Sequence, residues 1–465
     1  MKNSSGEVIV DFCFRRAGRI ILAASALVLI PSFVTVPSAQ AHGQAAAAGQ
    51  KNWKDRDEYD AFQKVTQTTD MKARLEALKA WEDKYPTSDF VDMRNQYFLD
   101  TYNNLSKTDP AMRQALLNKA QDSLKNDPKN ANTLYLISLW GPIVGGANPP
   151  ADLVSQVESA AHAFIAGADE AFSDDKKPAN LSAENWKTAK AARIAKAHQA
   201  LAWAATTKKD YPTAESEYRE SLTVYPDDAP TSSQFARMLY EEKDPKKIPE
   251  SLFEYARAGE YSGPGPTLPA AGKTAAIDFF NKLYKNYHGS DDGKDQILTQ
   301  AKTSALPPAG YSVVSINDLE NDKAKAINDR IAKDPGFGLW FSLKQQLTGD
   351  NGPAYFSSNV KDAELPGGAN GVKTFSGTIL TVEPADKPTR VTVGIEDPTK
   401  ADATLLFTNA IPTAALSKIK VGEKVEFSGV ADSFTKDPYM LTFKDPDIPG
   451  VQLAPPPPRP KGRKR

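Results

Sequence analysis

The residue types that most often carry catalysis or hold metals are few and scattered in this 465-residue sequence. Its single cysteine, Cys13, excludes an intramolecular disulfide framework and a thiolate metal cluster. The four histidines, at positions 42, 162, 198 and 288, are not spaced as metal ligands. We therefore predict no metal site and assign no catalytic residue.

One tripeptide, Gly272-Lys273-Thr274, matches the end of a phosphate-binding loop. That loop needs a glycine five residues before the glycine of the tripeptide, where this chain has Thr267. We therefore predict no nucleotide site and no cofactor. Acidic pairs such as Glu241-Glu242 fall in polar loops or at helix ends, where carboxylates are ordinarily solvated or cap helices. An enzyme whose site has no linear signature stays open as an alternative to a non-enzyme.

The clearest structural pattern lies in residues 195–228. There, apolar side chains recur in helical steps of three and four at Tyr211, Ala214, Tyr218 and Leu222. Pro226 ends this pattern, and a second helical stripe precedes it across the polar residues 206–210. The pattern predicts two short helices that form a hairpin. A single hairpin cannot bury its own apolar face, so neighbours must stack on both sides.

This hairpin resembles the tetratricopeptide repeat, a helix-turn-helix unit of about 34 residues. The resemblance rests on Leu201-Ala202, Ala214, Tyr218, Ser221-Leu222 and Pro226. The sequence departs from the family at His198, where the family has Trp, and at Ala205, where it has Tyr. A looser match follows Pro128. The resemblance implies an α-helical repeat domain over residues 53–306.

The resemblance also implies a binding surface. In the family, first-helix residues line a concave groove, and the matching positions here are Lys196, Gln199, Trp203 and Thr206. Their spacing of three, four and three places them on one face of the helix. An indole on the polar side of a helix usually has a partner, either another helix of the array or a bound peptide. These four residues are the candidate site for a protein or peptide partner.

The chain changes character after residue 306. Residues 307–369 are predicted to be a helical connector whose apolar stretch 337–347 docks on a neighbouring domain. Residues 370–450 contain five short segments that alternate at period two and are rich in β-branched and aromatic residues. They predict a small all-β domain similar to the oligonucleotide/oligosaccharide-binding barrel, with a β-sandwich as the alternative. The predicted fold is thus mainly α, a tetratricopeptide-like solenoid followed by a small barrel.

Both ends of the chain carry further signals. Arg15, Arg16 and Arg19 precede an apolar run of eleven residues and an Ala39-Gln40-Ala41 cleavage site, which predicts a signal peptide over residues 1–41. An uncleaved anchor is the alternative. Residues 42–52 form a linker. Residues 451–465 form a proline-rich basic tail that either is only solvated or contacts anionic envelope polymers or lipid head groups.

These features predict an exported, non-catalytic scaffold in the periplasm or cell envelope. The net charge of −1 provides no global attraction for nucleic acid, and the barrel strands carry few basic residues, so no nucleic-acid partner is expected. The alternative is a glycan- or peptidoglycan-binding protein that acts through the β domain. That alternative predicts exposed aromatic side chains on the barrel, with Phe434 and Tyr439 as candidates.

Overall fold

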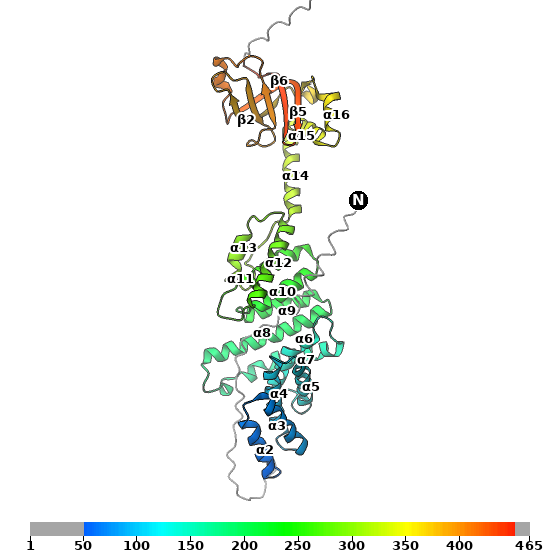
Figure 1. The fold of residues 1–465 in the computed structure, drawn as a ribbon, viewed down its shortest axis with the longest axis vertical. Helices are drawn as coiled ribbons and strands as arrows, with labels where there is room; N and C mark the ends of the chain where they lie inside the picture. The colour runs from blue at the N-terminus through cyan, green and yellow to red at the C-terminus, as the bar shows by residue number, and fades with distance from the viewer. Residues whose placement is uncertain (1–50, 452–465) are drawn as a thin grey trace, which may run out of the picture. The chain divides into compact units, whose positions relative to one another are not determined.

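A computed structural model describes residues 51–451 and divides the chain into two units (Figure 1). The first unit ends at Ile316, and the second begins at Asn317. The predicted signal peptide, most of the linker and nearly all of the basic tail lie outside the described residues. Within those residues, no helix is both long enough and apolar enough to span a membrane.

The first unit is an array of antiparallel helical hairpins. Each hairpin pairs two helices that follow one another in the chain, and successive hairpins pack together. The pairs are α2 (Arg56–Gln67) with α3 (Met71–Lys84), α4 (Val91–Ser106) with α5 (Ala111–Asn126), α6 (Ala131–Gly145) with α7 (Ala151–Ala171), α8 (Ala183–Thr207) with α9 (Tyr211–Val224), and α10 (Ala229–Glu241) with α11 (Ile248–Glu260). The last two helices of the unit, α12 (Ala270–His288) and α13 (Lys294–Ala301), both pack on α11. The predicted helical solenoid is confirmed.

The central hairpin shows why this sequence folds as it does. Ser182 and Asp210 cap α8 and α9, because each side chain accepts a hydrogen bond from the backbone N–H three residues later. The predicted stripe of α9 is buried at Ala214, Tyr218 and Leu222. Stacked on the next hairpin, the Tyr218 ring lies 5.5 Å from the ring of Phe235. The apolar face of one hairpin is therefore covered by its neighbour.

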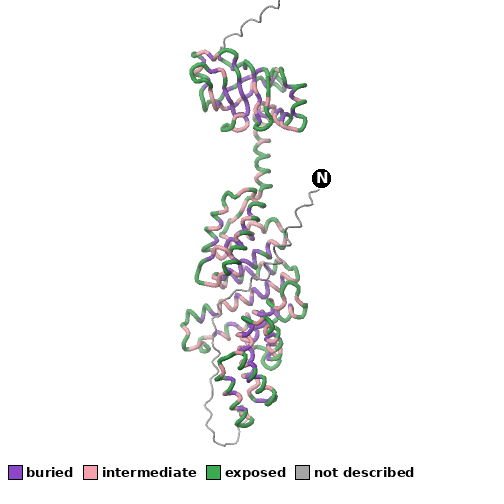
Figure 2. The backbone as a smooth tube through the Cα atoms, in the orientation of Figure 1, coloured by how far each residue is buried: buried purple, intermediate pink, exposed green. Residues whose placement is uncertain are grey.

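The hydrophobic core follows the array as a succession of clusters (Figure 2). Each cluster draws side chains from adjacent hairpins, as expected for a repeat whose units contact only their neighbours. The loop before α12 packs closely on the turn before α10. A Cβ atom at Gly265 would lie 1.9 Å from the carbonyl oxygen of Asp227, so only glycine fits there.

The second unit is a small barrel joined to short helices. Its helices are α14 (Ile316–Lys333), α15 (Pro335–Thr348), α16 (Gly352–Tyr355) and η3 (Phe356–Val360). Its strands are β1 (Glu364–Leu365), β2 (Phe375–Glu383), β3 (Arg390–Gly394), β4 (Ala403–Leu406), β5 (Lys424–Lys436) and β6 (Tyr439–Asp447). Strands β2 to β6 fall on the five predicted segments.

The strand pairing closes the barrel. The order is β5-β2-β3-β4-β6, and β6 pairs again with β5. The β4–β6 pair is parallel, and the other four pairs of the ring are antiparallel. This closed ring agrees with the predicted barrel and rules out the sandwich alternative. The inward positions form the core, where Phe375, Leu405, Phe427 and Phe443 are each fully buried.

Helix α15 seals this core. Trp340 is completely buried, and its ring lies 5.2 Å from the ring of Phe375. Its indole Nε1–H donates to Asp402, whose carboxylate also accepts the backbone N–H groups of Ile395 and Glu396. The stretch 337–347 thus docks on the barrel, as predicted, and residues 335–360 pack with the β strands as part of the second unit.

Candidate functional site

The four predicted partner-binding residues lie on α8, on a face that contacts both α6 and α10. Lys196 Nζ lies 2.8 Å from Asp228 Oδ2, and the Asp228 side chain is 1% exposed. Burial raises the pKa of Asp228, but the Lys196 ammonium and hydrogen bonds outweigh that effect and hold its pKa below the usual range. Lys196 remains partly accessible, with its side chain 16% exposed.

Gln199 is used inside the array. It is buried, and its amide nitrogen donates to Asp228 Oδ2 at 2.9 Å and to the hydroxyl of Thr231 on α10. It also donates to Ser221 on α9. This side chain therefore fastens α8 to the next hairpin.

Trp203 and Thr206 occupy the C-terminal part of the same face. The indole Nε1–H of Trp203 donates to the carbonyl oxygen of Gly146, the C-cap of α6, at 3.1 Å. Its ring also packs against Gly145, where an added Cβ would lie 2.7 Å from it. The partner of this indole in the structure is thus the end of another helix of the array. Thr206 is half-buried, and its hydroxyl donates to the Ala202 carbonyl.

Sequence reasoning missed Arg193, three residues before Lys196. Its guanidinium carbon lies 4.8 Å from the ring centre of Tyr135 on α6 and 5.5 Å from that of Phe172. Within residues 51–451, no carboxylate forms an ion pair with Arg193, and burial lowers its pKa. The available signal was its position: Arg193, Lys196 and Trp203 share one helical face, with spacings of three and seven.

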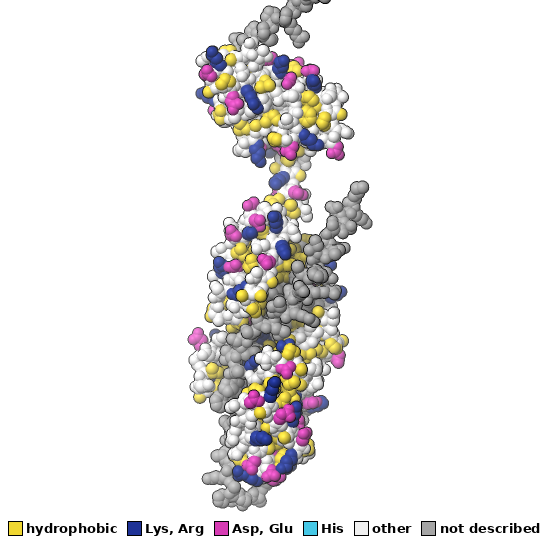
Figure 3. Space-filling view, viewed as in Figure 1, with side chains coloured by type: hydrophobic (Ala, Val, Ile, Leu, Met, Phe, Trp, Pro, Cys, Tyr) yellow, Lys and Arg dark blue, Asp and Glu magenta, His cyan; other side chains and the backbone are white. Residues whose placement is uncertain are grey.

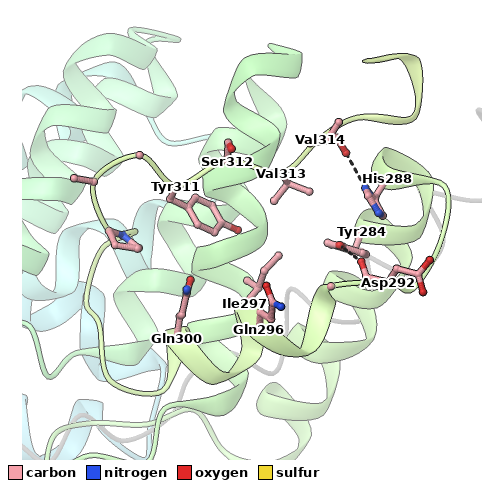
Figure 4. A pocket seen from close by; sticks show the side chains of 14 residues that line it. Tyr284, His288, Asp292, Gln296, Ile297, Gln300, Tyr311, Ser312, Val313 and Val314 are labelled. Carbon is pink, nitrogen blue, oxygen red and sulfur yellow. Dashed lines mark hydrogen bonds between the residues drawn. The ribbon is translucent and has the colours of Figure 1, made fainter. Parts of the chain in front are cut away.

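A second feature missed from the sequence is a pocket beside the last two helices of the first unit, called here the α12–α13 pocket (Figure 4). It has a volume of about 440 Å³ and lies between α12, α13 and residues 308–314. Its lining includes Tyr284, His288, Gln296, Gln300 and Tyr311. The available signals were the i, i+4 pair of glutamines and the alternating Tyr-Ser-Val-Val-Ser run that follows two prolines.

The glycan-binding alternative predicts exposed aromatic side chains at Phe434 and Tyr439, and neither side chain is exposed. The prediction for Tyr439 is wrong, because this residue is 9% exposed and belongs to the barrel core. Phe434 is half-buried and stacks on Phe356 at 4.8 Å. Both side chains are used in packing, since the barrel and the segment after α15 cover one another.

The sequence motifs that resemble parts of catalytic or nucleotide-binding sites take part in helix structure and surface ion pairs. Gly272-Lys273-Thr274 lies in the first turns of α12, and Lys273 Nζ donates to the Tyr261 carbonyl. Glu241 pairs with Arg237 on the surface of α10. No group of three His, Cys, Asp or Glu side chains in the described part of the chain is placed to hold a metal ion. On the face drawn in Figure 3, basic and acidic side chains are interspersed.

No protein-family model matches this sequence, and no curated protein is significantly similar to it.

Proposed function

We propose that this chain is an exported, non-catalytic scaffold that binds a segment of a partner protein through the α8 face of its helical array. The helical-hairpin architecture supports the proposal because stacked hairpins form extended surfaces for partner segments. We also propose that the array belongs to the tetratricopeptide type, on the strength of the residues quoted for the central hairpin. The exported location rests on the signal-peptide pattern at residues 1–41.

The observation that carries the proposal is the unpaired charge of Arg193. Lys196, on the same face, is neutralised by Asp228, whereas Arg193 stacks on Tyr135 and Phe172 and forms no ion pair in residues 51–451. A guanidinium held against aromatic rings keeps its fork of N–H donors available for a carboxylate. The partner segment is therefore expected to present a carboxylate to α8, either that of an acidic side chain or that of its C-terminus.

The four predicted residues have different parts in this proposal. Lys196 and Thr206 are half-buried and border the face, so they are proposed to touch the partner directly. Gln199 and Trp203 hold α8 to α10 and to the end of α6. They are proposed to keep the face in shape, since a displaced α8 would move Arg193 away from its aromatic supports.

The test is a crosslinking pull-down from the cell envelope with the mature protein and three variants. Arg193→Gln removes the charge, Arg193→Lys keeps it, and Arg56→Gln removes a charge from a side chain that is 76% exposed on α2. We expect Arg193→Gln to lose at least tenfold of the captured partner, Arg193→Lys to retain part of it, and Arg56→Gln to retain all of it. Equal capture by all four proteins, at matched melting temperatures, would contradict the proposal.

A further inference from the structure

An extended backbone segment borders the α12–α13 pocket. Residues 312–314 belong to no helix or strand, and none of their backbone N–H groups donates a hydrogen bond within the described residues. Val313 is half-buried, whereas Ser312 and Val314 are exposed. Backbone donors normally find partners in a folded protein, and an open extended edge is a template for another strand. The segment can therefore accept an added strand.

The segment is held in place before any strand arrives. The Tyr311 ring packs edge-on against Phe253 at 5.3 Å. His288 Nδ1 lies 2.8 Å from the Val314 carbonyl oxygen, which ties the far end of the segment to α12. Val313 packs on the core cluster of the last helices. A partner strand would meet an edge whose conformational freedom is already reduced, which lowers the entropy lost on binding.

Two glutamine amides line the pocket from α13. Gln296 and Gln300 are exposed, and their side chains form no hydrogen bond in residues 51–451. Residues four apart on a helix are separated by about 6 Å along its axis. An extended peptide advances by about 6.6–6.8 Å over two residues. Each amide offers donors and an acceptor, so the pair can meet successive peptide groups on one edge of an extended chain.

The charge of the pocket lining indicates which kind of side chain the bound peptide has there. The lining contains no lysine or arginine, and its carboxylate, Asp292, accepts a hydrogen bond from Ser290. Ile297 and Val313 supply apolar surface. The buried hydroxyl of Tyr311 has no hydrogen-bond partner in the described residues, and Figure 4 shows it directed into the pocket. An uncharged side chain suits this lining better than an anionic one, because the lining has no lysine or arginine that would repay the desolvation of an anion.

We propose that the α12–α13 pocket is a second docking site, which receives an extended, uncharged segment of a partner polypeptide. The segment pairs with the backbone of residues 312–314 and with the amides of Gln296 and Gln300, and it places one small apolar side chain in the pocket. This proposal rests on the proposed function, in that it assumes a protein partner. It adds a site, a backbone conformation and a sequence class that the α8 face does not specify.

The test uses a phage-displayed library of random 12-residue peptides, selected on the wild-type protein. The strongest binders are then synthesised and measured against the double variant Gln296→Ala/Gln300→Ala. A matched control, Gln345→Ala/Gln346→Ala, removes two exposed glutamines from α15. Both substituted pairs are exposed, so both variants are expected to fold. Residue-resolved amide exchange of Ser312, Val313 and Val314 is recorded with and without peptide.

We expect a set of peptides with a central run of uncharged residues. The pocket variant should lower their affinity at least tenfold, and the control should leave it unchanged. Among residues 312–314, exchange of the amides that face the added strand, which belong to alternate residues, should slow at least tenfold on binding. Peptides that bind the pocket variant equally well, or that leave these amides unprotected, would overturn the inference. If they instead lose affinity in Arg193→Gln, the proposed function stands without this site. Failure to enrich any peptide would count against both.

Discussion

The two units of the chain each bury a carboxyl group whose pKa burial raises, and they differ in how many hydrogen bonds they give it. In the barrel, Asp402 accepts hydrogen bonds from Trp340 and from the N–H groups of Ile395 and Glu396. In the array, Glu254 is completely buried, and among the described residues only the Ser232 hydroxyl is near enough to lower its pKa by hydrogen bonding, without good hydrogen-bond geometry. In the barrel, the carboxylate links α15 to the segment after β3 through these hydrogen bonds. The array carries a polar group whose burial costs stability.

The same contrast extends beyond these two residues. Most buried polar atoms that have no partner in residues 51–451 lie in the helical array, including Asp228 Oδ1, Glu250 Oε1 and the Tyr311 hydroxyl. Native proteins seldom leave such groups without a structural or functional reason. Two of these groups belong to the surfaces proposed to bind partners, since Asp228 pairs with Lys196 on the α8 face and Tyr311 lines the α12–α13 pocket.

The largest expected effect is in the barrel. Asp402→Ala leaves three donors without their acceptor, and each unsatisfied buried donor costs about 1–3 kcal/mol. We expect the second unit to lose about 4 kcal/mol of unfolding free energy. Hydrogen exchange measured by mass spectrometry in increasing urea separates the two units by their peptides. Peptides from 375–451 should exchange at lower urea, and peptides from 211–301 should not change. A loss below 1 kcal/mol would remove the contrast with Glu254.

The next effect is in the array and has the opposite sign. Burial raises the pKa of Glu254 to about 8, against an ordinary value of 4.5, and the nearby Arg257 only partly opposes this shift. The folded state therefore holds a proton that the unfolded state releases. The contribution of this group to stability is therefore most favourable below pH 4.5 and falls as the pH rises toward 8.

Glu254→Gln supplies a neutral side chain of the same shape, whose burial does not require the uptake of a proton. We expect the variant to be about 3 kcal/mol more stable than the wild type at pH 7, and nearly equal to it at pH 4.5. Unfolding in urea at a series of pH values, followed on peptides from 229–301, measures the difference. Equal slopes against pH for both proteins would show that Glu254 is ionised in the folded state.

The smallest effect concerns a surface residue of the array. Asp210 caps α9, because its side chain accepts the Thr213 N–H at 3.3 Å. Asp210→Ala should cost about 1 kcal/mol, the usual value of a lost cap. The same exchange experiment on peptides from 211–224 measures it. Thr223→Ala provides the comparison, since Thr223 is an exposed residue at the other end of α9. If both variants lost equal stability, the loss would not be specific to the cap.

The barrel was the more predictable unit from sequence. Strands β2, β5 and β6 alternate at period two because one face of each is buried, whereas β3 and β4 are buried on successive residues. The starts of the five strands could be predicted to within a residue, but β5 and β6 run past their predicted ends. A closed barrel was predicted with a sandwich as the alternative, and the sequence could not decide between them, since closure depends on β5 pairing with both β2 and β6. The docking of 337–347 could be predicted because an apolar helix must be covered, but its acceptor, Asp402, is 62 residues away from Trp340.

The candidate site was less predictable, for a definite physical reason. Helical spacing identifies the face that holds Lys196 and Gln199, but not the chain segment that covers it. Asp228 reaches that face from the N-cap of the next hairpin and takes both side chains as partners. Arg193 was overlooked because a charged residue on a helix is ordinarily solvated. Its significance depends on Tyr135, which is 58 positions earlier in the sequence.

Site-specific photocrosslinking tests directly whether a partner segment binds on the α8 face. A photoreactive amino acid is placed at Thr206, which borders that face, and separately at Glu220, an exposed residue of α9. The proteins are expressed in the native cell and irradiated. We predict a crosslinked partner from position 206 that disappears when Arg193→Gln is added, and no such product from position 220. A partner captured from position 220 alone, or from both positions regardless of Arg193, would contradict it.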